Sequence, residues 1–269
     1  MINESLLCSN PIVFLDSGVG GLTYFEWLNK QSPKESYVYI ADRENFPYGE
    51  KTPDEIRRIV ILRAGEIISR FSPKLFVLAC NTASVIALSA LREHFTIPFV
   101  GVVPAVKPAA LSTLTGKVGV LATTSTIQSE HYQNLLNRFG SAVDVINQPA
   151  PGLVELIEKG ELQSQHVKDL LVKFLQPMQQ AGVDKLVLGC THYPFVKQLI
   201  ETIMGNQVDV IDTGAAVARQ LKNQLSQFGL INQQNLPLSS DRFFTSGTTE
   251  HLEQMLQLLL GITTKAEKF

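Results

Sequence analysis

Residues 185–194 read KLVLGCTHYP, and the same order of residue types occurs earlier in the chain at residues 74–84, KLFVLACNTAS. Each stretch has a lysine, an apolar run, a small residue, a cysteine and then a threonine within two positions. A short apolar run bounded in this way is typical of a fully buried strand of a parallel sheet. The two thiols, Cys80 and Cys190, are therefore predicted to lie just beyond two buried strands.

Outward from these stretches, apolar runs rich in Val, Ile and Phe alternate with helical patterns along the chain. This alternation is typical of βα units on a mainly parallel sheet. Strands are predicted at residues 12–15, 37–41, 75–79, 99–103, 118–122, 143–146, 186–189, 208–211 and 242–245.

Two helices carry clear boundary signals. One begins at Thr52, because TPDE supplies an N-cap, a proline at the first helical position and a capping-box glutamate. The other is predicted over residues 165–181 and ends at Gly182, with a kink or an early stop at Pro177. The polar tail ITTKAEKF, residues 262–269, is expected to be mobile.

A repeat relates the two halves of the chain. FLDSGVGGLTYF at residues 14–25 and VLATTSTIQSEHY at residues 120–132 both read as a strand, a polar loop of small residues and a helix. Aligning Leu15 with Leu121 displaces the chain by 106 residues, and aligning the two cysteines displaces it by 110. Similar displacements for two separate features predict two α/β halves of one pattern.

Composition limits the classes of function. The chain has 269 residues, of which 45% are hydrophobic and 18% charged, as is ordinary for a globular protein with a sizeable core. The formal net charge is -2 and the sequence has no basic cluster, so it does not predict the basic surface that nucleic-acid binding requires. No apolar run reaches the roughly 20 residues of a membrane helix, and the N-terminus lacks a signal-peptide pattern. We therefore expect a cytoplasmic protein with neither a nucleic-acid nor a membrane partner.

The cysteine count argues against disulfides and metals. Cys8, Cys80 and Cys190 are an odd and sparse set, which indicates a reducing compartment rather than a disulfide framework. None of them belongs to a CxxC pair, and the five histidines show no metal-ligand spacing. No metal site is expected.

Ligands of open parallel sheets bind beyond the carboxyl ends of the strands. The residues at these positions are Asp16, Ser17, Asp42, Cys80, Asn81, Thr82, Thr123, Thr124, Cys190, Thr191, His192, Asp212 and Thr213. A buried cysteine is most often a small hydrophobic residue, and this interpretation is kept for Cys8. For Cys80 and Cys190 a chemical role is favoured, because a following helix start favours thiolate and because Asp16 or His192 can exchange a proton.

Three further motifs have two interpretations each. DSGVGG, residues 16–21, fits a phosphate-binding loop or the close approach of a carboxylate substrate, although it is neither GxGxxG nor a P-loop. FPYGEKTP, residues 46–53, fits a turn before a helix, or a phenol and a backbone amide that reach a small ligand. His192 fits a core histidine or, more in keeping with its place near Cys190, an acid/base group. Glu158, taken alone, fits a solvated helix residue.

The motifs DSGVGGL, FPYGEK, ACNTAS, GVVPA, LGCTHYP and IDTG occur in this order between residues 16 and 214. In this combination the sequence resembles glutamate racemase, a cofactor-independent isomerase family that makes D-glutamate for bacterial peptidoglycan and hence for cell wall biogenesis and cell shape. The resemblance implies two doubly wound, flavodoxin-like parallel-sheet domains in a pseudo-two-fold arrangement, with the active site between them. It favours a first domain of residues 1–97 plus 212–269 and a second domain of residues 98–211.

The resemblance also assigns roles to residues. Cys80 and Cys190 match the two acid/base thiols, and Asp16 and His192 match the groups that assist them. The matched substrate-binding positions are Asp16, Ser17, Pro47, Tyr48, Gly49, Asn81, Thr82, Thr191 and His192. Asp42 and Glu158 match looser patterns of the family. The implied partner is glutamate, with no cofactor; a peptidoglycan-precursor activator and a homodimer are both left open.

Two thiols suit the inversion of an α-carbon. One group removes a proton from one face while another delivers a proton to the opposite face, so neither has to move. A thiol has a pKa that a protein can bring close to neutrality, which allows one thiolate and one thiol at the start of each turnover. The resemblance implies Cys190 as the base for L-glutamate and Cys80 as the base for D-glutamate.

Three other functions compete with this one. A related two-cysteine isomerase would act on aspartate, and turnover of the two amino acids would separate the alternatives. A pyridoxal-phosphate racemase would need a lysine beyond a strand, whereas Lys74 and Lys185 precede theirs. A binding module that closes on a small acid would need no thiol pair, so serine at both positions would leave it working.

Overall fold

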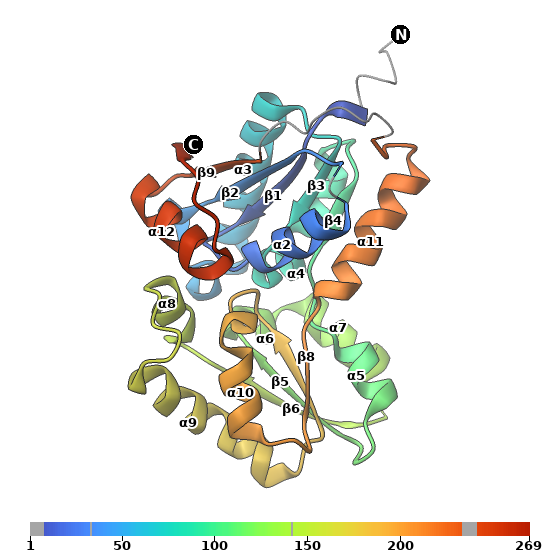
Figure 1. The fold of residues 1–269 in the computed structure, drawn as a ribbon. Coiled ribbons are helices and arrows are strands. Elements are labelled where there is room, and N and C mark those ends of the chain that lie inside the picture. Colours follow the sequence, from blue (N-terminus) through green and yellow to red (C-terminus); the bar gives the residue numbers. More distant parts are fainter. Residues whose placement is uncertain (1–7, 33, 141, 233–240) are drawn as a thin grey trace.

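The protein folds into two α/β lobes, each built on its own parallel sheet (Figure 1). The computed structural model describes residues 8–32, 34–140, 142–232 and 241–269. The first sheet has six parallel strands in the order β10-β9-β2-β1-β3-β4. These strands are β1 (Ile12–Asp16), β2 (Tyr37–Ala41), β3 (Leu75–Leu78), β4 (Phe99–Gly101), β9 (Arg242–Thr245) and β10 (Ala266–Lys268). Strands from the two ends of the sequence therefore share one sheet.

The second sheet repeats the topology of the first. It has four parallel strands in the order β6-β5-β7-β8, namely β5 (Lys117–Ala122), β6 (Asp144–Pro149), β7 (Lys185–Gly189) and β8 (Asp209–Ile211). This order corresponds to β2-β1-β3-β4 of the first sheet. The registers correspond as well, since Leu15 pairs with Leu78 and Leu121 with Leu188. The predicted repeat is thus present in the topology, and the two cysteines follow equivalent strands.

Helices cover both faces of each sheet, as the predicted doubly wound fold requires. In the first lobe, α2 (Leu22–Gln31), α11 (Gly214–Gln227) and α12 (Thr249–Leu260) share a core opposite α3 (Pro53–Phe71) and α4 (Asn81–His94). In the second lobe, α8 (Leu153–Glu158), α9 (Gln165–Ala181) and α10 (Lys197–Met204) share a core opposite α5 (Val106–Ser112) and α7 (Glu130–Phe139). A short helix, α6 (Thr124–Gln128), follows β5. Alternate residues of β1, such as Phe14 and Leu15, enter opposite cores.

The two helices with clear boundary signals form as their sequences predict. Before α3, the side chain of Thr52 accepts the N–H of Glu55 while the Glu55 carboxylate accepts the N–H of Thr52. α9 ends at Gly182, which adopts the left-handed conformation. The early stop expected at Pro177 is wrong, because α9 continues to Ala181. The neighbouring Met178 is fully buried in the core, and this packing offsets the single hydrogen bond that the proline removes.

The C-terminal tail forms a strand, so the expectation of a mobile tail is wrong. Residues 266–268 make up β10, which pairs with β9. The backbone N–H of Phe269 donates to the carbonyl of Thr245, and the Phe269 ring stacks beside Phe71 with centroids 6.4 Å apart. The tail is polar and only three residues pair, so its strand depends on the sheet edge that it meets.

We propose that the division into domains follows the two sheets. β9 and β10 return to the first sheet, which fits a discontinuous first domain. β8 pairs with β7 and ends at Ile211, which fits a limit near residue 212. However, β4 pairs with β3 of the first sheet, so a division by sheets moves the other limit from residue 97 to beyond Gly101.

Candidate active site

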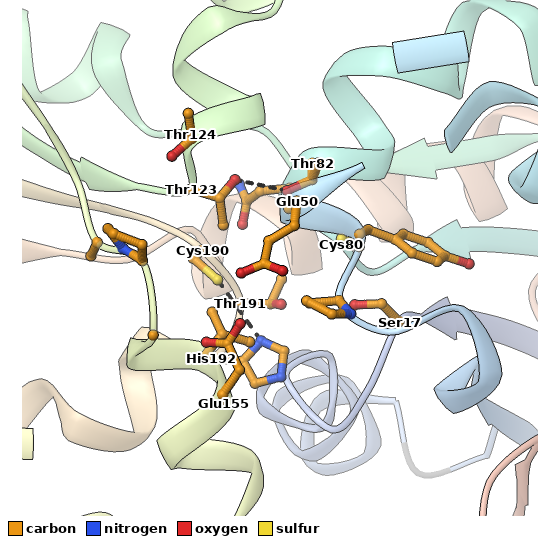
Figure 2. Close-up of a pocket in the computed structure, with 18 residues that line it drawn as sticks. Ser17, Glu50, Cys80, Thr82, Thr123, Thr124, Glu155, Cys190, Thr191 and His192 are labelled. Carbon is orange, nitrogen blue, oxygen red and sulfur yellow. Dashed lines mark hydrogen bonds between the residues drawn. The ribbon is translucent and has the colours of Figure 1, made fainter. Parts of the chain in front are cut away.

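The two cysteine thiols that the repeat singles out line one pocket between the lobes (Figure 2). Cys80 lies between β3 and α4, and Cys190 lies between β7 and the short 3-10 helix η3 (Tyr193–Val196). Each is 6% exposed. The pocket holds about 550 Å³ of empty space including its mouth. It is lined by Ser17, Pro47, Tyr48, Gly49, Glu50, Cys80, Asn81, Thr82, Thr123, Thr124, Ala150, Pro151, Gly152, Val154, Glu155, Cys190, Thr191 and His192.

Cys80 sits at the N-cap of α4, beside a buried carboxylate. Burial, followed by the negative charge of Asp16, raises the pKa of the Cys80 thiol well above its ordinary value. The backbone N–H groups of Ala83 and Thr82, in the first turn of α4, act in the opposite direction. A helix N-terminus favours a nearby negative charge, so this end of the pocket can stabilise a thiolate once a proton is lost.

Cys190 is paired with an imidazole instead. Its Sγ lies 3.8 Å from Nδ1 of His192, and Nε2 of the same ring lies 2.7 Å from the carboxylate of Glu158. Burial by itself lowers the pKa of His192, but the hydrogen bonds to Cys190 and Glu158 raise it well above its ordinary value. An ionised carboxylate can only accept, so Nε2 carries a proton and Nδ1 is the nitrogen that faces the thiol. The ring can therefore exchange a proton with Cys190.

Glu158 is fully buried, so the interpretation as a solvated helix residue is wrong. Its Oε1 accepts the backbone N–H of Val19 at 2.7 Å, in addition to Nε2 of His192. Burial alone raises the pKa of Glu158, but hydrogen bonds from His192 and His251 and the charge of Arg43 hold it well below its usual value. The carboxylate is therefore ionised at neutral pH, and it lies behind the pocket rather than in its lining.

The glycines of the loop after β1 make room for the other lobe. A Cβ on Gly18 would lie 1.8 Å from Oε1 of Glu158. A Cβ on Gly20 would lie 2.4 Å from Oγ1 of Thr191 and 2.5 Å from Nδ1 of His192. The carboxylate that approaches this loop thus belongs to the protein itself, and the space that a phosphate-binding loop would offer is occupied by side chains.

Asp16 lies under the pocket and is fully buried. One of its carboxylate oxygens accepts the N–H of Gly18 and the hydroxyl of Ser17, both at 3.2 Å, and the other accepts the hydroxyl of Thr191 at 3.2 Å. Burial raises its pKa, against the opposing effect of the nearby His192. Asp16 is not among the lining residues, so it contacts the pocket through Ser17 and Thr191.

Tyr48 lines the pocket, and its hydroxyl is engaged by a buried carboxylate. The hydroxyl donates to Asp42 at 2.7 Å, and burial together with this carboxylate raises the Tyr48 pKa well above its ordinary value. Asp42 is fully buried and also accepts Nε of Arg63 at 3.1 Å and the hydroxyl of Ser246 at 3.2 Å. The phenol expected to reach a ligand is therefore engaged, and Asp42 supports the loop of Tyr48 from behind the pocket.

Hydroxyl groups from both lobes meet at one wall of the pocket (Figure 2). Oγ1 of Thr82 lies 2.9 Å from Oγ1 of Thr123, and the hydroxyl of Ser125 donates to the carbonyl of Gly49 at 2.6 Å. The amide oxygen of Asn81 is buried without a hydrogen-bond partner among the described residues. The hydroxyls of this wall therefore contact one another across the two lobes. The amide oxygen of Asn81 is an acceptor that a ligand can use.

The structure brings together most of the predicted site and adds residues to it. Ser17, Pro47, Tyr48, Gly49, Cys80, Asn81, Thr82, Cys190, Thr191 and His192 share the pocket, while Asp16, Asp42 and Glu158 lie behind it. The additional lining residues are Glu50, Thr123, Thr124, Ala150, Pro151, Gly152, Val154 and Glu155. Thr123 and Thr124 could be predicted as lining residues from the sequence, because they directly follow the strand β5. The fold brings the loop between β6 and α8 to the pocket.

Two features are absent from the parts of the chain that the structure describes. No helix there combines the length and the apolar character needed to cross a membrane. No group of three or more His, Cys, Asp or Glu side chains there is arranged to hold a metal ion.

The chain is similar to known proteins over most of its length. The model of the family described as Asp/Glu/Hydantoin racemase matches residues 20–221. The glutamate racemase of Pseudomonas putida F1 is 48% identical over 262 residues, which is 97% of this chain and 98% of that protein. That of Ectopseudomonas mendocina is 45% identical over 260 residues, covering 96% and 98%.

Solved structures are similar over nearly the full length as well. The glutamate racemase isoform RacE1 of Bacillus anthracis superposes with a TM-score of 0.87 at 34% identity, covering 97% of each chain. The Escherichia coli glutamate racemase, solved in complex with L-glutamate and the activator UDP-MurNAc-ala, gives a TM-score of 0.84 at 33% identity, covering 96% of this chain and 97% of that one. The chain therefore belongs to the Asp/Glu/Hydantoin racemase family and groups within it with the glutamate racemases.

Proposed function

We propose that the protein interconverts L-glutamate and D-glutamate with two thiols as its bases. One cysteine, as thiolate, takes the α-proton from one face of the bound amino acid, and the other, as thiol, gives a proton to the opposite face. Cys190 is the base and Cys80 the acid when L-glutamate is the substrate, and the roles reverse for D-glutamate. One proton is taken up and one is released in each turnover, so the reaction needs no oxidant or cofactor.

The observation that carries this proposal is the placement of the thiols. Cys80 and Cys190 follow equivalent strands of two lobes and line the same pocket. A single base would have to cross from one face of the α-carbon to the other between two proton transfers. Two fixed groups on opposite walls avoid that movement, which is the arrangement that inversion requires.

The residues around each thiol support distinct proton-transfer partners. Asp16 lies close enough for its charge to raise the pKa of Cys80, after the larger effect of burial. His192 lies 3.8 Å from Cys190 and is held by Glu158. We propose that Asp16 assists Cys80 and that His192 assists Cys190. A base oriented by a carboxylate is a recurrent way to activate a nucleophilic or basic side chain.

The hydroxyl and amide groups of the pocket lining suit a small amino acid with two carboxylates. We propose that the hydroxyl of Thr82 and the backbone amide of Gly49 donate to the carboxylates. The hydroxyls of Ser17 and Thr191, which donate to Asp16 in the structure, turn to the substrate when it binds. The buried amide oxygen of Asn81, which has no partner among the described residues, is available to accept from the ammonium group. Donors aimed at the α-carboxylate also stabilise the charge that develops when the α-proton leaves.

The deciding experiment follows the α-proton in heavy water. Purified protein receives L- or D-glutamate without added cofactor, and the deuterium content and the enantiomer ratio are measured over time. Wild type is expected to incorporate deuterium and to invert the substrate. Cys80→Ser and Cys190→Ser are each expected to lose inversion by several orders of magnitude, since serine is a far weaker acid than cysteine.

Cys8→Ser is the matched control, because Cys8 lies outside the pocket and its thiol donates to the carbonyl of Gly229. It should retain wild-type activity. Aspartate is tested in parallel, and faster inversion of aspartate would replace glutamate as the proposed substrate. Full activity in both pocket variants would reject the two-thiol mechanism and leave a binding role for the pocket.

We further propose a cellular role in which the product, D-glutamate, supplies peptidoglycan synthesis in the cytoplasm. Activation by a peptidoglycan precursor is suggested by the activator named with the Escherichia coli relative. Adding UDP-MurNAc-ala to the assay tests this dependence, and a rate that does not change would reject it. A homodimer remains a prediction, for which sedimentation of the purified protein gives the test.

A further inference from the structure

A carboxylate of one lobe is held by groups of the other lobe, directly behind the pocket. Glu158 is the last residue of α8 in the second lobe, and α8 lies next to α12 of the first lobe (Figure 1). Oε1 takes the N–H of Val19 and Nε2 of His192, as described above. The other oxygen, Oε2, is 3.3 Å from Nε2 of His251 on α12 and 3.7 Å from a guanidinium nitrogen of Arg43.

The two carboxylate oxygens of Glu158 therefore bind different groups and play different structural roles. Oε1 sets the orientation of the His192 ring, and with it the nitrogen that faces Cys190 at 3.8 Å. Oε2 is bound only by first-lobe groups among the described residues, namely His251 and Arg43. If Oε2 lost these partners, the carboxylate could rotate about the bond between Cγ and Cδ. Oε1 would then no longer be held in one position relative to His192.

Arg43 alone holds this oxygen poorly. Its Nη1 is 3.7 Å from Oε2, beyond hydrogen-bond distance, and is buried without a hydrogen-bond partner among the described residues. Its guanidinium carbon lies 4.0 Å above the centre of the Phe46 ring, so its position is set largely by stacking. At 3.3 Å, His251 is the nearer of the two groups and has a ring nitrogen that can donate.

We propose that His251 is a positioning residue for the Cys190 side of the site: by donating to Oε2 of Glu158, it fixes the carboxylate that orients His192. The proposal rests on the proposed racemisation and deepens it, because it makes the last long helix of the chain part of the support for one of the two thiols. Among the described residues, Cys80 makes no hydrogen bond to Glu158, His192 or His251, and the charge of Asp16 is what connects it to them. Its chemistry should therefore depend on His251 much less than that of Cys190 does.

Thiol alkylation tests the proposal without using glutamate. His251→Ala is compared with His251→Gln, whose side-chain amide keeps an N–H donor, and with His166→Ala, which removes an exposed histidine of α9. Iodoacetamide labelling of each cysteine is followed by peptide mass spectrometry over a range of pH. The charged or titratable groups that face Glu158 are His192, His251, Arg43 and Asp16, and all four are unchanged in the His166→Ala control.

In His251→Ala, the labelling rate of Cys190 at neutral pH should fall about fivefold, the change expected from losing one hydrogen bond of ordinary strength. Labelling of Cys80 should stay within twofold of wild type, and His251→Gln should restore most of the Cys190 rate. With glutamate, kcat/KM should fall by a similar factor. No change at Cys190, or equal changes at both thiols, would overturn the proposal. Failure of glutamate turnover in wild type would reject the proposed function while leaving the labelling result to decide the role of His251.

Discussion

The end of β3 and the end of β7 are equivalent in topology and different in chemistry. Both strands pair with the first strand of their sheet in the same register, and both lead into a buried cysteine. Beyond Cys80 the chain enters a long helix, whose first N–H groups face the sulfur. Beyond Cys190 it enters a short 3-10 turn that carries His192. The repeated fold places two thiols at equivalent positions. The segments that follow them differ, so each thiol has different neighbouring groups.

This difference matters because the proposed reaction needs one active site to hold the two thiols in opposite protonation states. Identical surroundings would give two thiols with the same preference, and like charges in one small pocket oppose each other. Asp16 on one side and a His192–Glu158 pair on the other make the two positions distinguishable. We therefore expect that a substitution at Asp16 or His192 slows the proton transfer at the adjacent cysteine more than the transfer at the other cysteine.

The largest expected effect is on activity. His192→Asn and Asp16→Asn should each lower kcat/KM by about 10²–10⁴-fold, the usual contribution of a positioned acid/base group. Because the equilibrium constant is unity, kcat/KM falls equally in both directions. The asymmetry lies in primary isotope effects with α-deuterated glutamate. His192→Asn should enlarge the isotope effect for L-glutamate, for which Cys190 is the proposed base. Asp16→Asn should enlarge the isotope effect for D-glutamate, for which Cys80 is the proposed base. Equal effects for both enantiomers in both variants would contradict the assignment.

The second effect is on stability and compares the lysines at the start of the two strands. Lys74 precedes β3 and is paired with Glu35, and both side chains are almost completely buried. Lys185 opens β7 and pairs with the exposed Asp209 at 3.2 Å. Lys74→Met should lower the free energy of unfolding by about 3–5 kcal/mol, because it leaves a buried carboxylate without its cation. Lys185→Met should cost at most about 1 kcal/mol.

Urea unfolding measures both lysine variants. A second variant, Lys74→Met combined with Glu35→Leu, removes both charges and should recover much of the lost stability. If Lys74→Met and Lys185→Met lowered the free energy of unfolding by similar amounts, burial of the Lys74 ion pair would not make it contribute more than the exposed pair of Lys185.

The smallest effect is the pH dependence contributed by the Glu158–His192 pair on the Cys190 side. The folded pKa of Glu158 lies below its ordinary 4.5, so its contribution to stability is present above pH 4.5 and is lost as the pH falls. The folded pKa of His192 lies above its ordinary 6.5, so its contribution is full below pH 6.5 and is lost as the pH rises through the folded value. The pair therefore contributes fully between these two values.

Thermal unfolding of wild type and Glu158→Gln across pH 3–9 checks this window. The difference in Tm should be greatest near pH 5–6 and should be on the order of 2–4 °C per kcal/mol of lost stability. It should shrink toward pH 3. A difference in Tm that does not vary with pH would show that Glu158 contributes by packing alone.

Much of the fold could be predicted because its signals are local. Apolar runs located the strands through β9, and the repeat of a strand before each cysteine predicted two equivalent halves. The strand at residues 266–268 could not be predicted, because its residues are polar and pair only where β9 offers an edge. The helix over residues 165–181 was predicted correctly, but the early stop expected at Pro177 is wrong, since burial of Met178 outweighs the local effect of proline.

By itself, the sequence determined which residues follow the strands, and therefore that two thiols, an aspartate and a histidine stand at the carboxyl ends of parallel sheets. Only the tertiary structure decided which of them meet. Glu158 has the local pattern of an exposed helix residue, yet the closure of two lobes buries it against Gly18, His192 and His251. In one of the two interpretations of residues 46–53, the Tyr48 phenol reaches a ligand, whereas in the structure its hydroxyl donates to Asp42. Periodicity records which face of an element is apolar, whereas partners from distant parts of the chain are fixed by packing between elements.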